Sequence, residues 1–450
     1  MAKRRVETLA LVILGAVAAL LYSSPAYARF RFQGDFSASG EYNDNINSAS
    51  TKPISDRIWT ASPSITLTEA NARRNVSLNF GYSTRRYIKT TIQNRDTYTN
   101  GVSGRYNFSR RTFVDFYNTL SYTPRVVTQS TNFAPVFTDA GIVTQLITRT
   151  TPSKLYNDDV GASLNHQLNR RTTFSLQGKA SIHRFSSKLF DNSDQTSVRA
   201  DINYRASKRD TFDLSAAHSF YSFGNTISET RDNSVMLIWY REMSRVFRGQ
   251  AQLTVIDDRT KTFVNNSTIG SRSEQLQAGG LYSIDRNTTL TVLAGASFAQ
   301  RVGNTAGAQP TSGGNSPAPV YDVSLSRRFV HSTITARVRQ TFNAGFSSGF
   351  DTSFEGLTYS YEVTPALLLE ANLSRSASKS TGNAQGAQSI NTDTVALYLR
   401  VSYKIDRRTF ASISYSGVNQ KSKGAGVGGN IKQNIVIISI DLLDLTHRNP

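Results

Sequence analysis

The sequence predicts an all-β fold, a transmembrane antiparallel up-and-down β-barrel of about 20 strands, within a range of roughly 18 to 22. Three observations support this prediction. Apolar and polar residues alternate over segments long enough to cross a membrane. Tight turns and longer loops alternate between these segments, and an export signal precedes the first of them.

The alternation is clearest in four segments. Even positions are apolar or small in 174–183, 198–205 and 290–298, and odd positions are apolar in 395–404, with mostly polar residues between them. A period of two residues over a full span is typical of strands with one face to lipid and one to the lumen. Aromatic residues close to the expected strand ends predict interfacial girdles: Tyr82, Tyr106, Tyr122, Tyr204, Tyr403 and Tyr415.

The connections are of two kinds. Tight basic or polar turns are expected at 72–74, 109–111, 169–171, 207–209, 243–245, 285–287, 327–328, 362–364 and 406–408. Longer loops rich in Asn, Ser, Thr and Gly are expected at 43–57, 89–96, 126–155, 187–194, 224–230, 259–270, 302–317, 346–351, 379–390 and 420–430. Short periplasmic turns and long extracellular loops are typical of outer-membrane barrels, and an even strand number puts both chain ends on the periplasmic side.

The N-terminus reads as an export signal. Lys3, Arg4 and Arg5 form a positive region, Leu9–Leu21 is apolar, and Ala26-Tyr27-Ala28 is a cleavage site. We therefore expect a signal peptide at 1–28, a single barrel domain at 29–450, and the cell outer membrane as destination. Arg4-Arg5 could indicate a twin-arginine signal, but nothing around the pair supports that route.

Composition narrows the class of protein. The chain has no cysteine, 38% hydrophobic residues and a net charge of +19. Such a charge in a cytoplasmic protein would indicate nucleic acid; for an exported chain we expect no nucleic acid. The expected partners are outer-membrane lipids and lipopolysaccharide, the barrel-assembly machinery, and a polysaccharide or polysaccharide-secretion proteins.

A soluble all-β sandwich or propeller is the alternative fold. Its strands would be shorter, about 5 to 6 residues, and an open sheet with one fully apolar face would aggregate. The alternation therefore favours the barrel.

A barrel of this strand number encloses water unless something plugs it. The loop at 126–155 is long and apolar, so we expect it to pack on something. Two arrangements remain open: a constriction loop folded into the pore, or a hairpin that extends two strands or packs over the rim.

Residues at alternate positions of a strand share one face, and the positions between the apolar ones are expected to face the lumen. Among the charged residues that we place there, bases predominate. The candidates for anion selectivity are Lys179, Arg199, Arg205, Arg337, Arg339, Arg400 and Lys404. Acids are expected on the same face at Asp115, Asp201, Asp213 and Glu370. Rings of fixed charge set pore selectivity, which favours an anionic solute. The alternative is cross-strand ion pairs that only stabilise the wall, such as Arg199 with Asp213.

No catalytic, cofactor or metal site is expected. The five histidines lie in neither a G-x-S-x-G nor an H-E-x-x-H motif, and no metal-ligand cluster or phosphate-binding loop is visible. We therefore predict that the chain is not an enzyme.

The segment Glu41-Tyr42-Asn43-Asp44-Asn45-Ile46, followed by Ser55-Asp56-Arg57 and Ser62-Pro63-Ser64-Ile65-Thr66-Leu67, resembles a known family. It is similar to the outer-membrane β-barrel porins found with exopolysaccharide and exosortase gene clusters. The resemblance covers about 40 residues and implies a porin-like protein that serves secretion of a surface polysaccharide. Barrels of this kind usually end on an aromatic residue, whereas here the expected last strand, 431–443, runs into 444–450.

The leading functional hypothesis is a channel for anionic solutes, linked to exopolysaccharide secretion. The alternative is a structural or adhesive barrel with a closed lumen, whose loops are the functional part. A lipid- or glycan-modifying enzyme is third and would need a Ser or Asp with a histidine partner at the rim. Conductance separates the first two.

Overall fold

The computed structural model describes residues 29–128, 134–138, 141–145, 151–186, 192–224, 228–262, 267–304, 317–344, 349–380, 391–423 and 429–443. The predicted signal peptide, 1–28, lies outside these residues. No helix in the described ranges is long and apolar enough to cross a membrane.

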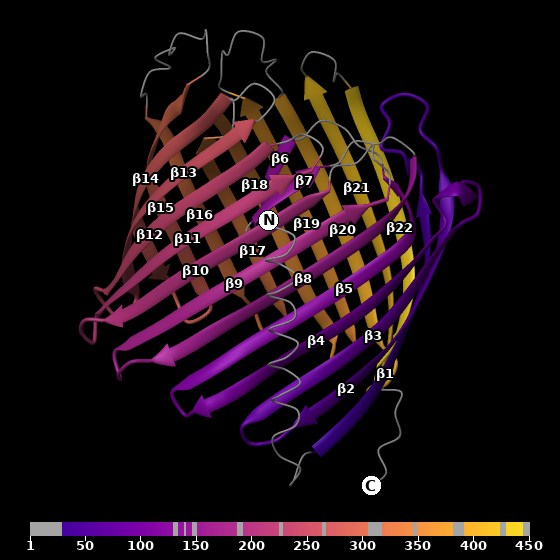
Figure 1. Cartoon of the computed structure of the whole chain (residues 1–450), viewed down its shortest axis with the longest axis horizontal. Helices are drawn as coiled ribbons and strands as arrows, with labels where there is room; N and C mark the ends of the chain where they lie inside the picture. The colour runs from indigo at the N-terminus through magenta and orange to yellow at the C-terminus, as the bar shows by residue number, and fades with distance from the viewer. Residues whose placement is uncertain are drawn as a thin grey trace.

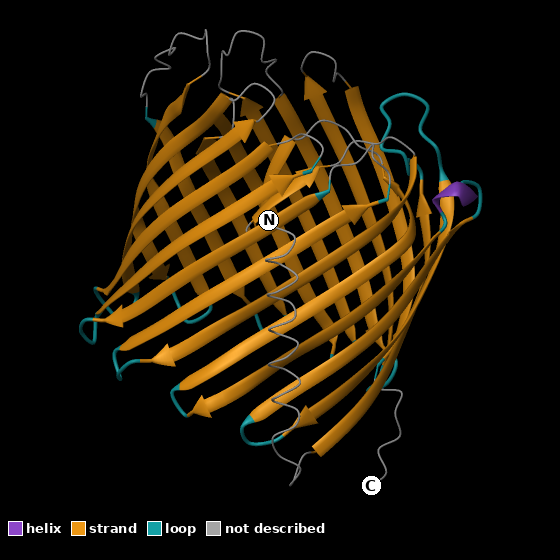
Figure 2. Ribbon diagram, viewed as in Figure 1, coloured by secondary structure: helices purple, strands orange, loops and turns teal. Residues whose placement is uncertain are grey.

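Twenty long antiparallel strands form one closed sheet (Figures 1 and 2), which confirms the predicted fold class and strand number. The strands of this wall are β1(Arg29–Asn43), β2(Asp56–Ala70), β3(Arg74–Tyr87), β4(Arg95–Ser109), β5(Thr112–Thr128), β8(Thr151–Gln167), β9(Thr172–Phe185), β10(Ser193–Arg205), β11(Asp210–Phe223), β12(Ser228–Glu242), β13(Phe247–Thr262), β14(Ser267–Ser283), β15(Thr288–Asn304), β16(Ala318–Arg328), β17(Ser332–Ala344), β18(Gly349–Thr364), β19(Leu367–Ser380), β20(Asn391–Lys404), β21(Thr409–Lys423) and β22(Gly429–Leu442).

Each wall strand pairs with the next along the chain, and β22 pairs with β1 to close the barrel. The one interruption is a hairpin of β6(Ala134–Thr138) and β7(Gly141–Gln145), which forms a separate two-stranded sheet while β5 pairs directly with β8. The predicted loop at 126–155 thus contains strand structure of its own. Its remaining residues, 129–133, 139–140 and 146–150, lie outside the described ranges.

The short turns lie at one end of the barrel and the long connections at the other (Figure 1). This confirms the predicted asymmetry, with two shifts. The turn expected at 327–328 lies at 329–331, because β16 continues to Arg328. The turn expected at 362–364 lies at 365–366, since the Thr364 hydroxyl accepts hydrogen bonds from the amides of Ala366 and Leu367 and so sets the end of β18.

The outer face of the barrel is apolar. Cross-strand rows such as Leu214–Leu237–Leu253–Leu276 run around it, and these four side chains are all exposed. Few large apolar side chains in the described residues are fully buried, Ile58 and Val320 among them. A sheet this large with exposed apolar rows and almost no packed core is a sheet that faces lipid.

Tyrosines mark one boundary of the apolar surface. Tyr82, Tyr98, Tyr122 and Tyr156 form a row on the outer face of β3, β4, β5 and β8, with ring centroids 5.2, 6.4 and 5.4 Å apart. This row is an aromatic belt at the long-loop end. The expectation for Tyr415 was wrong: it lies in the middle of β21, where its hydroxyl donates to Asn434.

Candidate functional site: the lumen wall and the barrel seam

The strand register decides which side chains face the lumen. Partners in neighbouring strands share a face, so every residue in register with the exposed apolar rows points outward and its chain neighbours point inward. By this criterion all seven candidate bases lie on the inner face, on β9, β10, β17 and β20.

Two of the candidates on β17 converge on one carboxylate. The Arg337 guanidinium lies 2.6 Å from the Asp322 carboxylate on β16, and that of Arg339 lies 4.0 Å from it. All three side chains are partly exposed. Two lumen-facing bases on one strand therefore share a single acid of the neighbouring strand.

The other candidates divide into paired and unpaired bases. Lys179 lies 4.0 Å from Asp159, and Arg400 lies 4.0 Å from Glu370. Arg205 and Lys404 are exposed at the short-turn end, and no ion pair is recorded for either among the described residues.

The pairing expected for Arg199 was wrong. Its guanidinium donates to Asp201 two residues along β10, at 2.8 Å, and Asp213 instead accepts from the Asn203 amide. The register explains the difference, because Asp213 stands opposite Asn203, whereas Arg199 stands opposite Ala217. Asp115, the acid expected on β5, pairs with Arg105 at 2.6 Å.

The sequence analysis missed several acids of the inner face. Register places these carboxylates toward the lumen: Asp35, Glu41, Asp159, Asp232, Glu242, Asp258, Asp322, Glu362 and Asp441. The parity rule applied to every strand would have found them. The charge of the described inner face is therefore uneven: acids gather on β12 and β13, while bases outnumber acids on β16–β20.

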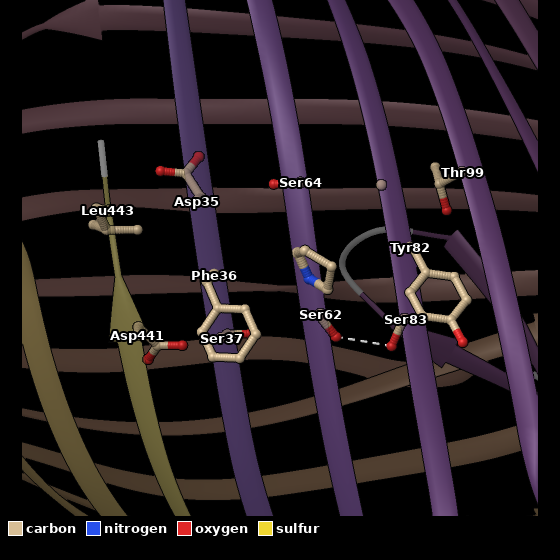
Figure 3. Close-up of a pocket in the computed structure, with 12 residues that line it drawn as sticks. Asp35, Phe36, Ser37, Ser62, Ser64, Tyr82, Ser83, Thr99, Asp441 and Leu443 are labelled. Carbon is tan, nitrogen blue, oxygen red and sulfur yellow. Dashed lines mark hydrogen bonds between the residues drawn. The ribbon is translucent and has the colours of Figure 1, made fainter. Parts of the chain in front are cut away.

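One sector of the wall carries small hydroxyl side chains. A hollow of about 350 Å³ lies over β1–β4 beside the end of β22 (Figure 3), and its lumen-facing residues are Asp35, Ser37, Ser62, Ser64, Ser83, Thr99 and Asp441. The Ser62 and Ser83 hydroxyls are hydrogen-bonded at 2.8 Å. This surface can donate to and accept from a hydroxylated solute.

Three of the histidines have hydrogen-bond partners within the wall. His183 contacts the Asn157 side chain at 2.8 Å, His218 contacts Asn233 at 2.7 Å, and His166 contacts Thr112 at 2.8 Å. The described residues contain no cluster of three or more His, Asp or Glu side chains that could hold a metal ion.

The seam between the first and last strands is short. Only residues 36–43 of β1 pair with β22, although β1 pairs with β2 over its whole length. The loop after β1 extends the contact beyond the ladder. The Asn434 backbone amide and side-chain amide donate to Asp44 at 2.7 and 2.6 Å, and Gln433 donates to the Asn45 carbonyl at 2.9 Å.

Asn45 is the centre of this contact, and its side chain is 1% exposed. Its amide donates to the carbonyls of Ala49 at 2.9 Å and Lys432 at 2.8 Å, and it accepts from the Ala49 amide at 3.0 Å. We call Asn43, Asp44, Asn45, Lys432, Gln433 and Asn434 the seam clasp. The Tyr-Asn-Asp-Asn motif of the sequence therefore ties the two ends of the sheet together.

Asp56, also part of the quoted motif, fixes the neighbouring loop. It accepts from the amides of Arg57, Lys89 and Thr90 and from the Thr90 hydroxyl at 2.5–2.9 Å, next to the short helix η1(Thr91–Gln93). Burial alone would raise the pKa of Asp56, but these hydrogen bonds outweigh it and lower the pKa. The carboxylate is thus charged and holds the loop at neutral pH.

Comparison with known families bears on the same N-terminal strands. Residues 27–131 match the family model described as "Putative beta-barrel porin 2". The match is to a porin family. It covers β1–β5, including the clasp residues of the first loop. None of the curated protein sequences matches the chain.

Several receptors are among the solved structures with similar folds. They include the ferric-catecholate import receptor Fiu from E. coli K12 (TM-score 0.54, 8% identity, 91% of this chain and 81% of that one). The siderophore receptor PiuA from Acinetobacter baumannii has a TM-score of 0.54 and 9% identity, over 91% of this chain and 81% of that one. A mutant ferric enterobactin receptor from Pseudomonas aeruginosa has a TM-score of 0.51 and 8% identity, over 92% of this chain and 80% of that one. At these identities the likeness concerns the fold alone. The closed barrel, its apolar outer face and the porin-family match together describe a porin-like outer-membrane barrel.

Proposed function

We propose that this barrel is an outer-membrane channel for hydrophilic solutes, with a preference for anions. The observation that carries the proposal is the excess of bases over acids on the lumen face of β16–β20. The inner face of these strands carries five bases, Arg328, Arg337, Arg339, Arg400 and Lys404. It carries three acids, Asp322, Glu362 and Glu370. Fixed charge on a pore wall raises the local concentration of counter-ions, so this side of the lumen favours anionic solutes.

Because the barrel is wide, we expect only a modest preference for anions over cations. A closed sheet of this strand number encloses a water-filled lumen unless a loop fills it. Wall charges act within about 8–10 Å at physiological ionic strength, so a solute feels them mainly when it passes close to β16–β20. Selectivity should therefore be strongest at low salt.

Replacing Arg337 and Arg339 together with Glu is expected to shift the reversal potential toward cations. The substitution changes the local charge on β17 from two positive to two negative groups beside Asp322. The measurement is the reversal potential of single channels in planar bilayers across a salt gradient. A matched variant, Arg259→Glu with Arg272→Glu, reverses two bases of the outer face and should keep the wild-type value. Unchanged selectivity in the β17 variant would contradict the proposed pathway.

We further propose that the cargo belongs to a surface polysaccharide carrying acid groups and that 1–28 is removed during export to the outer membrane. The resemblance of the residues around the first loop to that family supports this cargo. The Ser and Thr hydroxyls of the hollow over β1–β4 can bind the hydroxyl groups of such a chain, whereas Asp35 and Asp441 in the same hollow repel its acid groups. Purified acidic polysaccharide added to one side of the bilayer should interrupt the current, and a neutral dextran of the same length should do so less. Equal interruption by both polymers would contradict a charge-selective polysaccharide path.

A further inference from the structure

The short turns share a local design. In all but the β16–β17 turn, a side-chain oxygen at the start of the turn accepts backbone N–H groups two or three residues later: Asn71, Ser109, Asn169, Ser207, Ser244, Asp285, Thr364 and Asp406. Such caps fix the turn backbone.

The carboxylates that cap two of the turns accept hydrogen bonds from backbone amides. The amide of Asn287 donates to Asp285 and lowers its pKa, and the amide of Arg408 does the same for Asp406. The acids of these turns are therefore engaged in holding the turn. The positive charge of Arg408 also helps to lower the pKa of Asp406.

Basic residues fill the turns. We call the following exposed side chains the basic turn ring: Arg73, Arg110, Arg111, Arg170, Arg171, Lys208, Arg209, Arg245, Arg286, Arg407 and Arg408. Within the part of the chain that the structure describes, no ion pair is recorded for any of them. Bases elsewhere are commonly paired: at the opposite rim, the Arg184, Arg259, Arg272 and Arg375 side chains lie 2.5–3.1 Å from Asp194, Asp257, Glu274 and Asp393.

Apolar side chains stand beside the ring on the lipid-facing side. Phe108 lies at the last outward position of β4, and Leu168, Ile284 and Ile405 directly follow the ends of β8, β14 and β20. They are 63%, 55%, 51% and 54% exposed. Exposed apolar residues directly next to unpaired cations are the pattern of a surface that meets lipid and its anionic headgroups together. A soluble acidic partner would need the cations but would leave these side chains in water.

We propose that the basic turn ring binds the phosphate groups of anionic phospholipids in the periplasmic leaflet. The apolar residues at the strand ends contact the upper part of the acyl chains. The guanidinium groups of successive turns each meet a headgroup phosphate, for which their fork of donors is suited. The ring thereby fixes the depth of the barrel and surrounds it with anionic lipid.

The test uses the folded full-length barrel in detergent micelles containing equal amounts of phosphatidylglycerol and phosphatidylcholine, with retained lipid counted by native mass spectrometry. The wild type should retain mainly phosphatidylglycerol. The variant Arg110→Gln, Arg111→Gln, Arg170→Gln, Arg171→Gln keeps the capping residues. It should lose at least about fivefold of that preference, which is the factor that a single base near an anionic surface contributes.

The matched control removes four bases at the opposite rim: Arg184→Gln, Arg259→Gln, Arg272→Gln, Arg375→Gln. It should retain phosphatidylglycerol as the wild type does. If this variant of two turns fails to fold, Arg407→Gln with Arg408→Gln serves in its place. Equal retention of both lipids by the wild type, or undiminished preference in the turn variant, overturns the proposal. Binding of polyglutamate without any preference for phosphatidylglycerol would overturn it in favour of a soluble acidic partner.

Discussion

The Asn45→Ala variant is expected to lose about 3 kcal/mol of unfolding free energy, because it leaves several buried polar groups of the seam without partners. The substitution removes the donors to the Ala49 and Lys432 carbonyls and the acceptor for the Ala49 amide. The seam is where this loss matters most, since β1 and β22 pair only over residues 36–43 and 435–442. Urea unfolding in lipid vesicles, followed by the fluorescence of Trp59 and Trp239, measures the change.

Asn47→Ala is the matched control. Asn47 lies in the same loop and also makes side-chain hydrogen bonds, to Lys52 and Ile54, but these are exposed to water. Its replacement should cost no more than about 0.5 kcal/mol. Equal stability of the two variants would show that the clasp does not hold the seam.

Gly295→Ala should weaken or break the pairing of β14 with β15. A Cβ atom at this position would clash with the Leu276 carbonyl oxygen and stand 2.7 Å from the Gln277 Cα, so the backbones would have to separate. Overpacking of this kind costs about 3 kcal/mol or more when the neighbour is main chain. We expect a lower urea midpoint and a smaller fraction of protein that shows heat-modifiable gel migration.

Gly178→Ala provides the comparison. A Cβ atom on Gly178 would meet nothing within 4 Å, because this residue lies on the outer face of β9 in open space. The variant should fold with wild-type yield and stability. If Gly295→Ala does so as well, the close approach of β14 and β15 is not required for the barrel.

The fold was predictable because the lipid-facing rows impose a strict two-residue period. A shift of the 198–205 strand by one residue would place the apolar side chains of Val198 and Ile202 in the lumen. The alternation therefore determines the face on which each residue lies. The tight turns were equally visible, since Asn71, Ser109 and Asp406 are residues that cap turns with their side chains.

The site was less predictable for a different physical reason. The alternation along a strand shows which face a residue occupies, but it does not show which side chain of the neighbouring strand lies next to it. That partner depends on the register between the two strands. Arg199 was therefore assigned to Asp213 although it pairs with Asp201. The role of Asn45 was hidden for the same reason, because its contact with Lys432 joins residues from opposite ends of the chain. The motif was noticed, but only closure of the barrel explains it.

The central claim, an open channel, is tested most directly by single-channel conductance of the refolded wild-type protein. Planar bilayers should show large, steady steps, with a reversal potential across a salt gradient that indicates anion preference, greater at low ionic strength. The absence of conductance, in protein whose folding is established by heat-modifiable gel migration, would contradict the claim. It would favour a closed barrel in which the β6–β7 hairpin and the surface loops are the functional part.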